Sequence, residues 1–203
     1  LTTMDGRHTI KALKLIDPHR EEFKEIRVDV FFDISVKMAA EIFYELTMNS
    51  KRMDPWSAFY SAHQAGYDFA VDIWSSIQDR ELSTPIDDGV PPKRDRHLDI
   101  IGPVIEAWHH GIADQLLDYI RIFRSEKNDR IPEEAKKCEF QRGLIDFHRT
   151  NCEEYDDAEL YDALSEMSIG EYIDEAEKII AKARKVRINR GEWAKAFEQC
   201  LTR

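Results

Sequence analysis

The sequence predicts a mainly helical α+β fold, with an N-terminal antiparallel β-hairpin packed on about six α-helices. Three observations favour it. Residues 26–34 alternate apolar and polar side chains with a period of two, which is typical of a half-buried strand. Beyond Ile34, apolar residues recur every three or four positions, the period of amphipathic helices. Apolar residues make up 42% of the chain and include four Trp, so a substantial core is expected.

The hairpin is expected over residues 9–34. Residues 9–16 form a second β-leaning run, and the polar stretch 17–24 separates it from the regular strand. Two strands alone are only marginally stable. We therefore expect the helices, or strands from a partner chain, to cover the apolar face of the hairpin.

The remaining residues, 35–203, predict a helical body. Ser35 is a suitable N-cap for a first helix, and Asp54 with Pro55 opens a second helix that the apolar stripe extends to Ile77. A long loop is expected over 78–96, where Pro and Gly are frequent. The later helices are expected at 99–125, 132–147, 157–167, 168–187 and 193–201. Ser168 and Glu171 match a capping box at the start of the helix 168–187. Because neither side of the loop looks self-sufficient, the sequence predicts one compact domain over residues 1–203.

Charge is unevenly distributed along the chain. The formal net charge is −11. The segment 178–203 carries eight basic and two acidic residues, a sum of +6, so residues 1–177 sum to −17. An acidic body disfavours broad contact with phosphates.

The sequence favours a cytoplasmic location. No apolar run is long enough to span a membrane, and the first nine residues lack a secretory signal. Three widely spaced cysteines favour a reducing cytoplasm over a disulfide framework.

A ridge of possible metal ligands follows the helix expected at 99–125. Glu106, His110 and Asp114 are spaced by four residues, which places them on one helical face. Carboxylate and imidazole groups so placed could bind a divalent cation. Glu106 and His109 also resemble the Glu-x-x-His pattern of ferritin-like di-iron proteins, which use two such motifs, but the sequence holds only one. The alternative is a solvated polar face.

Arg142 and His148 form the one pattern that suggests nucleolytic catalysis. Their spacing resembles the Arg-x(4–6)-His motif of HEPN ribonucleases, which are helical and act as dimers. The resemblance implies that Arg142 stabilises the scissile phosphate and that His148 transfers a proton. It covers seven residues, and Gly143 stands where the family usually has a polar residue. The alternative is that both are surface residues.

An acidic stretch follows, with eleven Asp and Glu and no Lys or Arg between Thr150 and Glu177. Glu171 and Asp174 have a one-turn spacing that could share a Mg²⁺ ion. Such pairs resemble the carboxylates of MazG-like nucleotide pyrophosphatases. The alternative is a solvated surface, or a surface on which a partner docks.

The last candidate is the basic segment 178–190. Lys178, Lys182 and Lys185 follow one helical face, which could contact RNA, DNA or an acidic protein. There are two alternatives. The lysines could compensate the helix dipole, or they could pair with the acidic stretch of the same chain.

These patterns predict an intracellular, non-catalytic interaction protein, such as an adaptor, an inhibitor or a subunit of an assembly. No phosphate loop, nucleophile elbow or zinc motif occurs, and no cofactor is expected. The expected partner is another protein or a second copy of the chain. One alternative is an enzyme, either a HEPN-like ribonuclease or a Mg²⁺-dependent nucleotide hydrolase. The other is nucleic-acid binding through Lys178–Arg190.

Overall fold

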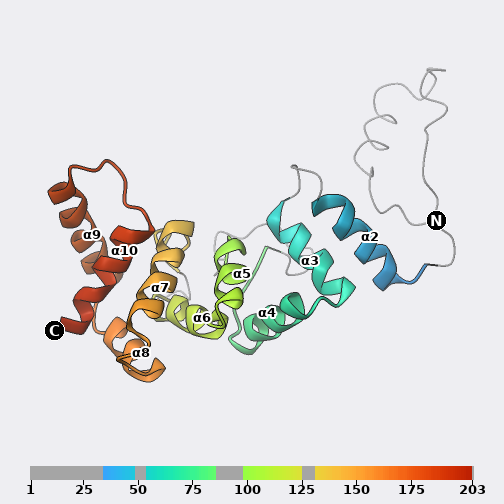
Figure 1. Ribbon diagram of the computed structural model, residues 1–203, viewed down its shortest axis with the longest axis horizontal. Helices are drawn as coiled ribbons and strands as arrows, with labels where there is room; N and C mark the ends of the chain where they lie inside the picture. Colours follow the sequence, from blue (N-terminus) through green and yellow to red (C-terminus); the bar gives the residue numbers. More distant parts are fainter. Residues whose placement is uncertain (1–33, 49–53, 86–97, 125–130, 203) are drawn as a thin grey trace, which may run out of the picture. The chain divides into compact units, whose positions relative to one another are not determined.

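The computed structural model describes residues 34–48, 54–85, 98–124 and 131–202 (Figure 1). Within these residues the chain forms nine α-helices and a short 3₁₀ helix, and no strand occurs among them. The prediction of an α+β fold is therefore wrong for the described part of the chain, which is all-helical. That class depended on the hairpin alone, because every later stretch has a helical period. The predicted hairpin, 9–34, lies outside the described residues except for Ile34.

The chain divides after Tyr67 into two compact units, 1–67 and 68–203. In the described part of the first unit, helix α2 (Val36–Met48) packs along helix α3 (Pro55–Ala65). The predicted caps of both helices are confirmed. Ser35 Oγ accepts a hydrogen bond from the Met38 N–H, and Asp54 accepts one from the Ser57 N–H, which satisfies backbone donors at each N-terminus.

The single long helix predicted after Asp54 is wrong, because α3 ends at Ala65. Gly66 adopts a left-handed conformation with φ of 80° and caps α3, as glycine commonly does at helix C-termini. Helix α4 (Asp68–Asp79) then begins in the second unit. The apolar stripe continues across the break, so periodicity alone did not reveal it.

A second glycine breaks the helix predicted at 99–125. Helix α5 (Gly102–His109) and helix α6 (Ala113–Ile122) are separated by a turn in which Gly111 has φ of 74°. The predicted loop 78–96 overlaps the end of α4, and residues 86–97 lie outside the described part. No helix among the described residues is both long and apolar enough to cross a membrane.

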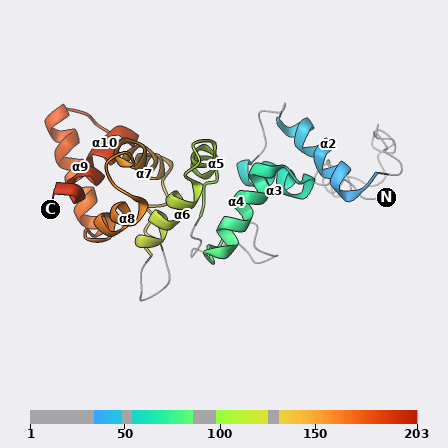
Figure 2. The ribbon, with the colours of Figure 1, turned by 60° about the horizontal axis from the view of Figure 1, so that its bottom comes forward.

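Four further α-helices complete the second unit (Figures 1 and 2). They are α7 (Cys138–Asn151), α8 (Asp157–Ser165), α9 (Ile169–Ala183) and α10 (Arg190–Phe197), with the 3₁₀ helix η2 (Glu198–Thr202) at the end. The predicted capping box of Ser168 and Glu171 is confirmed at the start of α9. The helix predicted to begin at Pro132 begins six residues later, at Cys138, because turns occupy 133–136 and a bend lies at 137.

Aromatic side chains at the end of α6 and on α7 and α10 form a core in the second unit. The ring of Phe140 lies 4.8 Å from Trp193, 5.0 Å from Phe197 and 5.2 Å from Phe123, measured between ring centroids. All of these pairs are edge-to-face, a favourable geometry for aromatic rings. Gly143 allows this close approach, because a Cβ atom at that position would overlap the Cβ of Trp193. Helix α10 is therefore seated directly on the backbone of α7.

Candidate functional site

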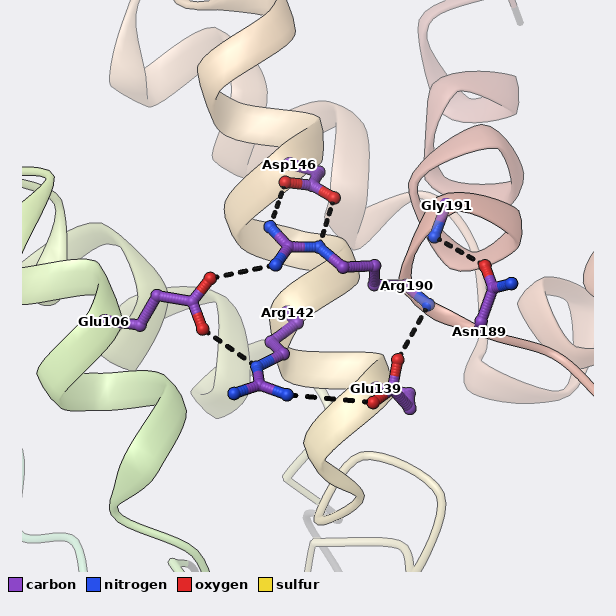
Figure 3. A network of polar contacts seen from close by, with 7 residues as sticks. All are labelled: Glu106, Glu139, Arg142, Asp146, Asn189, Arg190 and Gly191. Atoms are coloured by element: carbon purple, nitrogen blue, oxygen red, sulfur yellow. Dashed lines mark hydrogen bonds and ion pairs between the residues drawn. The ribbon is translucent and has the colours of Figure 1, made fainter.

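Arg142, the first candidate catalytic residue, is held by carboxylates. Its Nε donates a hydrogen bond of 2.8 Å to Glu106 Oε2, and its Nη1 lies 3.8 Å from Glu139 Oε1 (Figure 3). Glu106 comes from α5 and Glu139 from the first turn of α7. The hydrogen bond to Glu106 raises the pKa of Arg142 above its usual value, so this side chain is a fixed cation.

Arg190, at the start of α10, binds the same group of carboxylates. Its guanidinium makes a two-point contact with Asp146, in which Nε donates to Oδ2 over 2.7 Å and Nη2 donates to Oδ1. Its Nη1 donates to Glu106 Oε1 over 3.0 Å, and its backbone N–H donates to Glu139 Oε2 over 3.0 Å. Figure 3 shows Glu106 receiving one hydrogen bond from each arginine.

We call these five residues, Glu106, Glu139, Arg142, Asp146 and Arg190, the Glu106 network. It joins α5, α7 and the N-terminus of α10 in the second unit. Three carboxylates and two guanidiniums leave one net negative charge, which does not favour a phosphate ligand. The side chains are half-buried, with Glu106 24% exposed and Asp146 28% exposed. In this arrangement the network holds three helices together.

His148, the second candidate catalytic residue, is buried among other polar groups. Its Nδ1 lies 2.8 Å from the Tyr119 hydroxyl of α6, and its Nε2 lies 3.8 Å from Asp157 Oδ1 at the start of α8. The other oxygen of Asp157 accepts a hydrogen bond of 2.8 Å from Gln115 Nε2. Since a carboxylate faces Nε2, the favoured neutral tautomer carries its proton there and accepts the Tyr119 O–H at Nδ1.

Burial is the largest cause of the pKa shifts of His148 and Tyr119. Desolvation lowers the pKa of His148 below its usual value, while Asp157 acts weakly in the opposite direction. Desolvation also raises the pKa of Tyr119. Both rings are therefore neutral near pH 7, and His148 is 4% exposed. A neutral, buried imidazole with a tyrosine partner fits a structural link between α6, α7 and α8.

The structure gives Arg142 and His148 separate sets of partners. Six residues along a helix correspond to a rotation of about 240°. Arg142 contacts carboxylates on α5 and α7, whereas His148 contacts residues on α6 and α8. Gly143, which departs from the HEPN pattern, is explained by its contact with Trp193. No local spacing in the sequence links Arg190 or Tyr119 to the motif, so neither was predicted. Asp146 lies within the motif, but its partner Arg190 is 44 residues away in sequence.

The three possible metal ligands predicted on the 99–125 helix do not converge on one site. Glu106 belongs to the Glu106 network, while Asp114 lies 2.9 Å from the guanidinium of Arg80, which also binds Asp118. His110 is the C-cap residue of α5, where its backbone N–H donates to carbonyl groups of the last turn, and its side chain is exposed. The break at Gly111 interrupts the predicted ridge.

The second pair of possible ligands lies on α9. Glu171 accepts hydrogen bonds from the backbone N–H and the hydroxyl of Ser168, whereas Asp174 is exposed one turn later. Among the residues that the structure describes, no three His, Cys, Asp or Glu side chains gather closely enough to hold a metal ion.

Two of the three lysines expected to bind nucleic acid form ion pairs with glutamates. Lys178 Nζ lies 2.6 Å from Glu175 on the same helix, and Lys185 pairs with the buried Glu192 of α10. The contact with Lys185 is the largest cause of the lowered pKa of Glu192. Lys182 lies on the exposed side of α9. The basic segment is therefore partly engaged in local structure.

Comparison with known proteins adds no relative from which a role could be transferred. No protein-family model, curated protein or solved structure matches the chain.

Proposed function

We propose that the chain is a non-catalytic interaction protein acting in the cytoplasm. One observation supports this more than any other: both residues of the best catalytic motif serve internal contacts. Arg142 is bound to Glu106, and the His148 ring is buried against Tyr119. A ribonuclease would need both side chains directed at one scissile phosphate.

Surface charge supports the same proposal. The chain has a net charge of −11, which disfavours a long phosphate backbone as partner. Exposed carboxylates are concentrated at α8, where Glu159 and Asp162 of the helix and the C-cap residue Glu166 are all exposed. No disulfide links the three cysteines, which agrees with a reducing compartment. A folded protein with a complementary surface is the partner class that fits these features.

The first experiment tests for catalysis. Purified full-length chain is incubated with single-stranded RNA and with nucleoside triphosphates, with Mg²⁺ and with EDTA. We expect no turnover above buffer under any condition. Turnover by the wild type that His148→Gln removes, in protein with unchanged circular dichroism, would contradict the proposal.

The second experiment tests for interaction. The tagged chain is used to capture proteins from its native host, beside an Asp162→Lys/Glu166→Lys variant. The matched control is Asp174→Lys/Glu177→Lys, which changes the net charge equally at two exposed positions outside α8. We expect a stoichiometric protein that the control retains and the α8 variant loses. Capture of nucleic acid in place of protein would contradict the proposal.

A further inference from the structure

The connection between α9 and α10 presents positive charge around an exposed apolar side chain. We call Lys182, Arg184, Val186 and Arg187 the basic tip. All four are exposed, and Val186 is 93% exposed. Arg184 ends α9 with φ of 53°, a conformation that costs energy for any residue other than glycine. The chain therefore maintains a strained turn that exposes a branched apolar side chain between cations.

The outer surface of α8 has the complementary composition. We call Glu159, Tyr161 and Asp162 of α8, together with its C-cap residue Glu166, the acidic face. All four are exposed, and Tyr161, at 38%, is one of six large apolar side chains that are exposed in the part of the chain that the structure describes. The basic tip thus combines an aliphatic side chain with cations, and the acidic face combines an aromatic ring with carboxylates. Each surface offers what the other would bind.

The two surfaces of one chain do not meet. Helix α9 lies between them, and its 15 residues correspond to about 22 Å. Figures 1 and 2 both show the α9–α10 connection at the end of α9 that is remote from α8. Exposed charges are screened beyond about 8 Å at physiological ionic strength. The basic tip and the acidic face of one chain are therefore too far apart to pair with each other.

We propose that the basic tip of one chain binds the acidic face of a second copy of the same chain, in a head-to-tail manner. This inference rests on the proposed interaction function and names its partner. The apolar contact would be Val186 on Tyr161, with Lys182 and Arg187 facing the carboxylates of α8. Because the two surfaces differ, the contact is heterologous, and copies can extend into a chain or close into a ring.

A second copy fits better than a polyanion. A nucleic acid would contact the cations of the basic tip but would leave the exposed Val186 without an apolar partner. A second copy supplies carboxylates and an aromatic ring on the exposed side of one helix. Exposed charge pairs are weak one by one, so we expect a reversible association that depends strongly on salt.

Sedimentation velocity of the full-length chain tests the proposal, at up to about 200 µM protein in about 50 mM and about 500 mM NaCl. We expect oligomers that grow with concentration at low salt, and an apparent dissociation constant that rises at least about tenfold at high salt. A wild-type chain that is monomeric at low salt over the whole concentration range would overturn the proposal.

Paired charge reversals make the test specific. The tip variant is Lys182→Glu/Arg187→Glu, and the face variant is Asp162→Lys/Glu166→Lys. Each alone should be monomeric, whereas the Lys137→Glu/Lys195→Glu control, at two exposed positions outside α8, should associate like the wild type. The net charges are −11 − 4 = −15 for the tip variant and −11 + 4 = −7 for the face variant. Both remain negative, so net charge does not draw them together.

A mixture of the two variants decides the outcome. The reversed tip of one variant complements the reversed face of the other, and the unreversed surfaces also match, so mixing should restore association. Circular dichroism and thermal melting verify that each variant is folded. A mixture that stays monomeric, or a control that dissociates equally, would overturn the proposal. A monomeric wild type that still captures a different protein through α8 would refute the second copy as partner but leave the interaction function intact.

Discussion

Replacing Gly143 with Ala should destabilise the second unit by forcing α7 and α10 apart. The new Cβ would overlap the Cβ of Trp193 and lie 3.2 Å from the carbonyl oxygen of Arg190. Neither atom is the end of a flexible side chain. Relief therefore requires movement of the α10 backbone, which also carries Arg190 into the Glu106 network.

Two opposing effects determine the expected change in the free energy of unfolding. Overpacking by one methyl group in a close-packed interior typically costs about 1–3 kcal/mol. Alanine is a better helix former than glycine by about 1 kcal/mol, which offsets part of this loss. We therefore expect Gly143→Ala to lower the free energy of unfolding by up to about 2 kcal/mol.

Gly170→Ala is the matched control, because Gly170 lies in the first turn of α9, where the nearest atom to an added Cβ is Ser168 Oγ at 3.8 Å. It should raise stability by about 0.5 kcal/mol. Urea unfolding followed by circular dichroism measures both variants, and hydrogen exchange should show faster exchange along α10 in Gly143→Ala alone. Equal effects of the two substitutions would refute the close helix contact.

Three further predictions concern the polar contacts. Because burial lowers the pKa of His148, the unfolded chain binds more protons below about pH 6.5, so stability should fall as the pH drops through that range, and His148→Gln should flatten this part of the unfolding profile. Glu106→Gln should cost about 1–2 kcal/mol in urea unfolding, since two charged hydrogen bonds weaken in a half-exposed setting. Glu133→Gln, at a 78% exposed side chain that pairs with Lys136, should change stability by less than about 0.5 kcal/mol. Asn189→Ala removes the side-chain cap of α10. It should lower the free energy of unfolding by about 1 kcal/mol, which a lower melting temperature would show.

Local signals in the sequence predicted the helix caps correctly. Ser35, Asp54 and Ser168 each cap a helix as expected, because a cap involves residues within one turn of each other. Helix breaks at Gly66 and Gly111 were missed for the opposite reason. The apolar period runs through both, and only the tertiary structure selects a positive φ at these glycines.

The contacts between helices in the polar clusters could not be predicted from spacing. Arg190 reaches Glu106 across 84 residues of sequence, and Arg142 reaches it across 36. A charged residue on a helix face looks the same in sequence whether it meets water, a ligand or a second helix. The seven-residue resemblance around Arg142 and His148 therefore identified two important residues, but the contacts that they make are structural.

Stability and association should respond to different substitutions if these inferences are correct. Gly143→Ala and Glu106→Gln act inside the second unit, at contacts between α5, α7 and α10. The reversal of Lys182 and Arg187 acts on exposed side chains at the far end of α9. A combined variant should therefore show the stability loss of the first set and the association loss of the second, each nearly unchanged. Strong coupling between the two losses would mean that the basic tip supports the fold, and that its exposed charges have a structural role in place of a binding one.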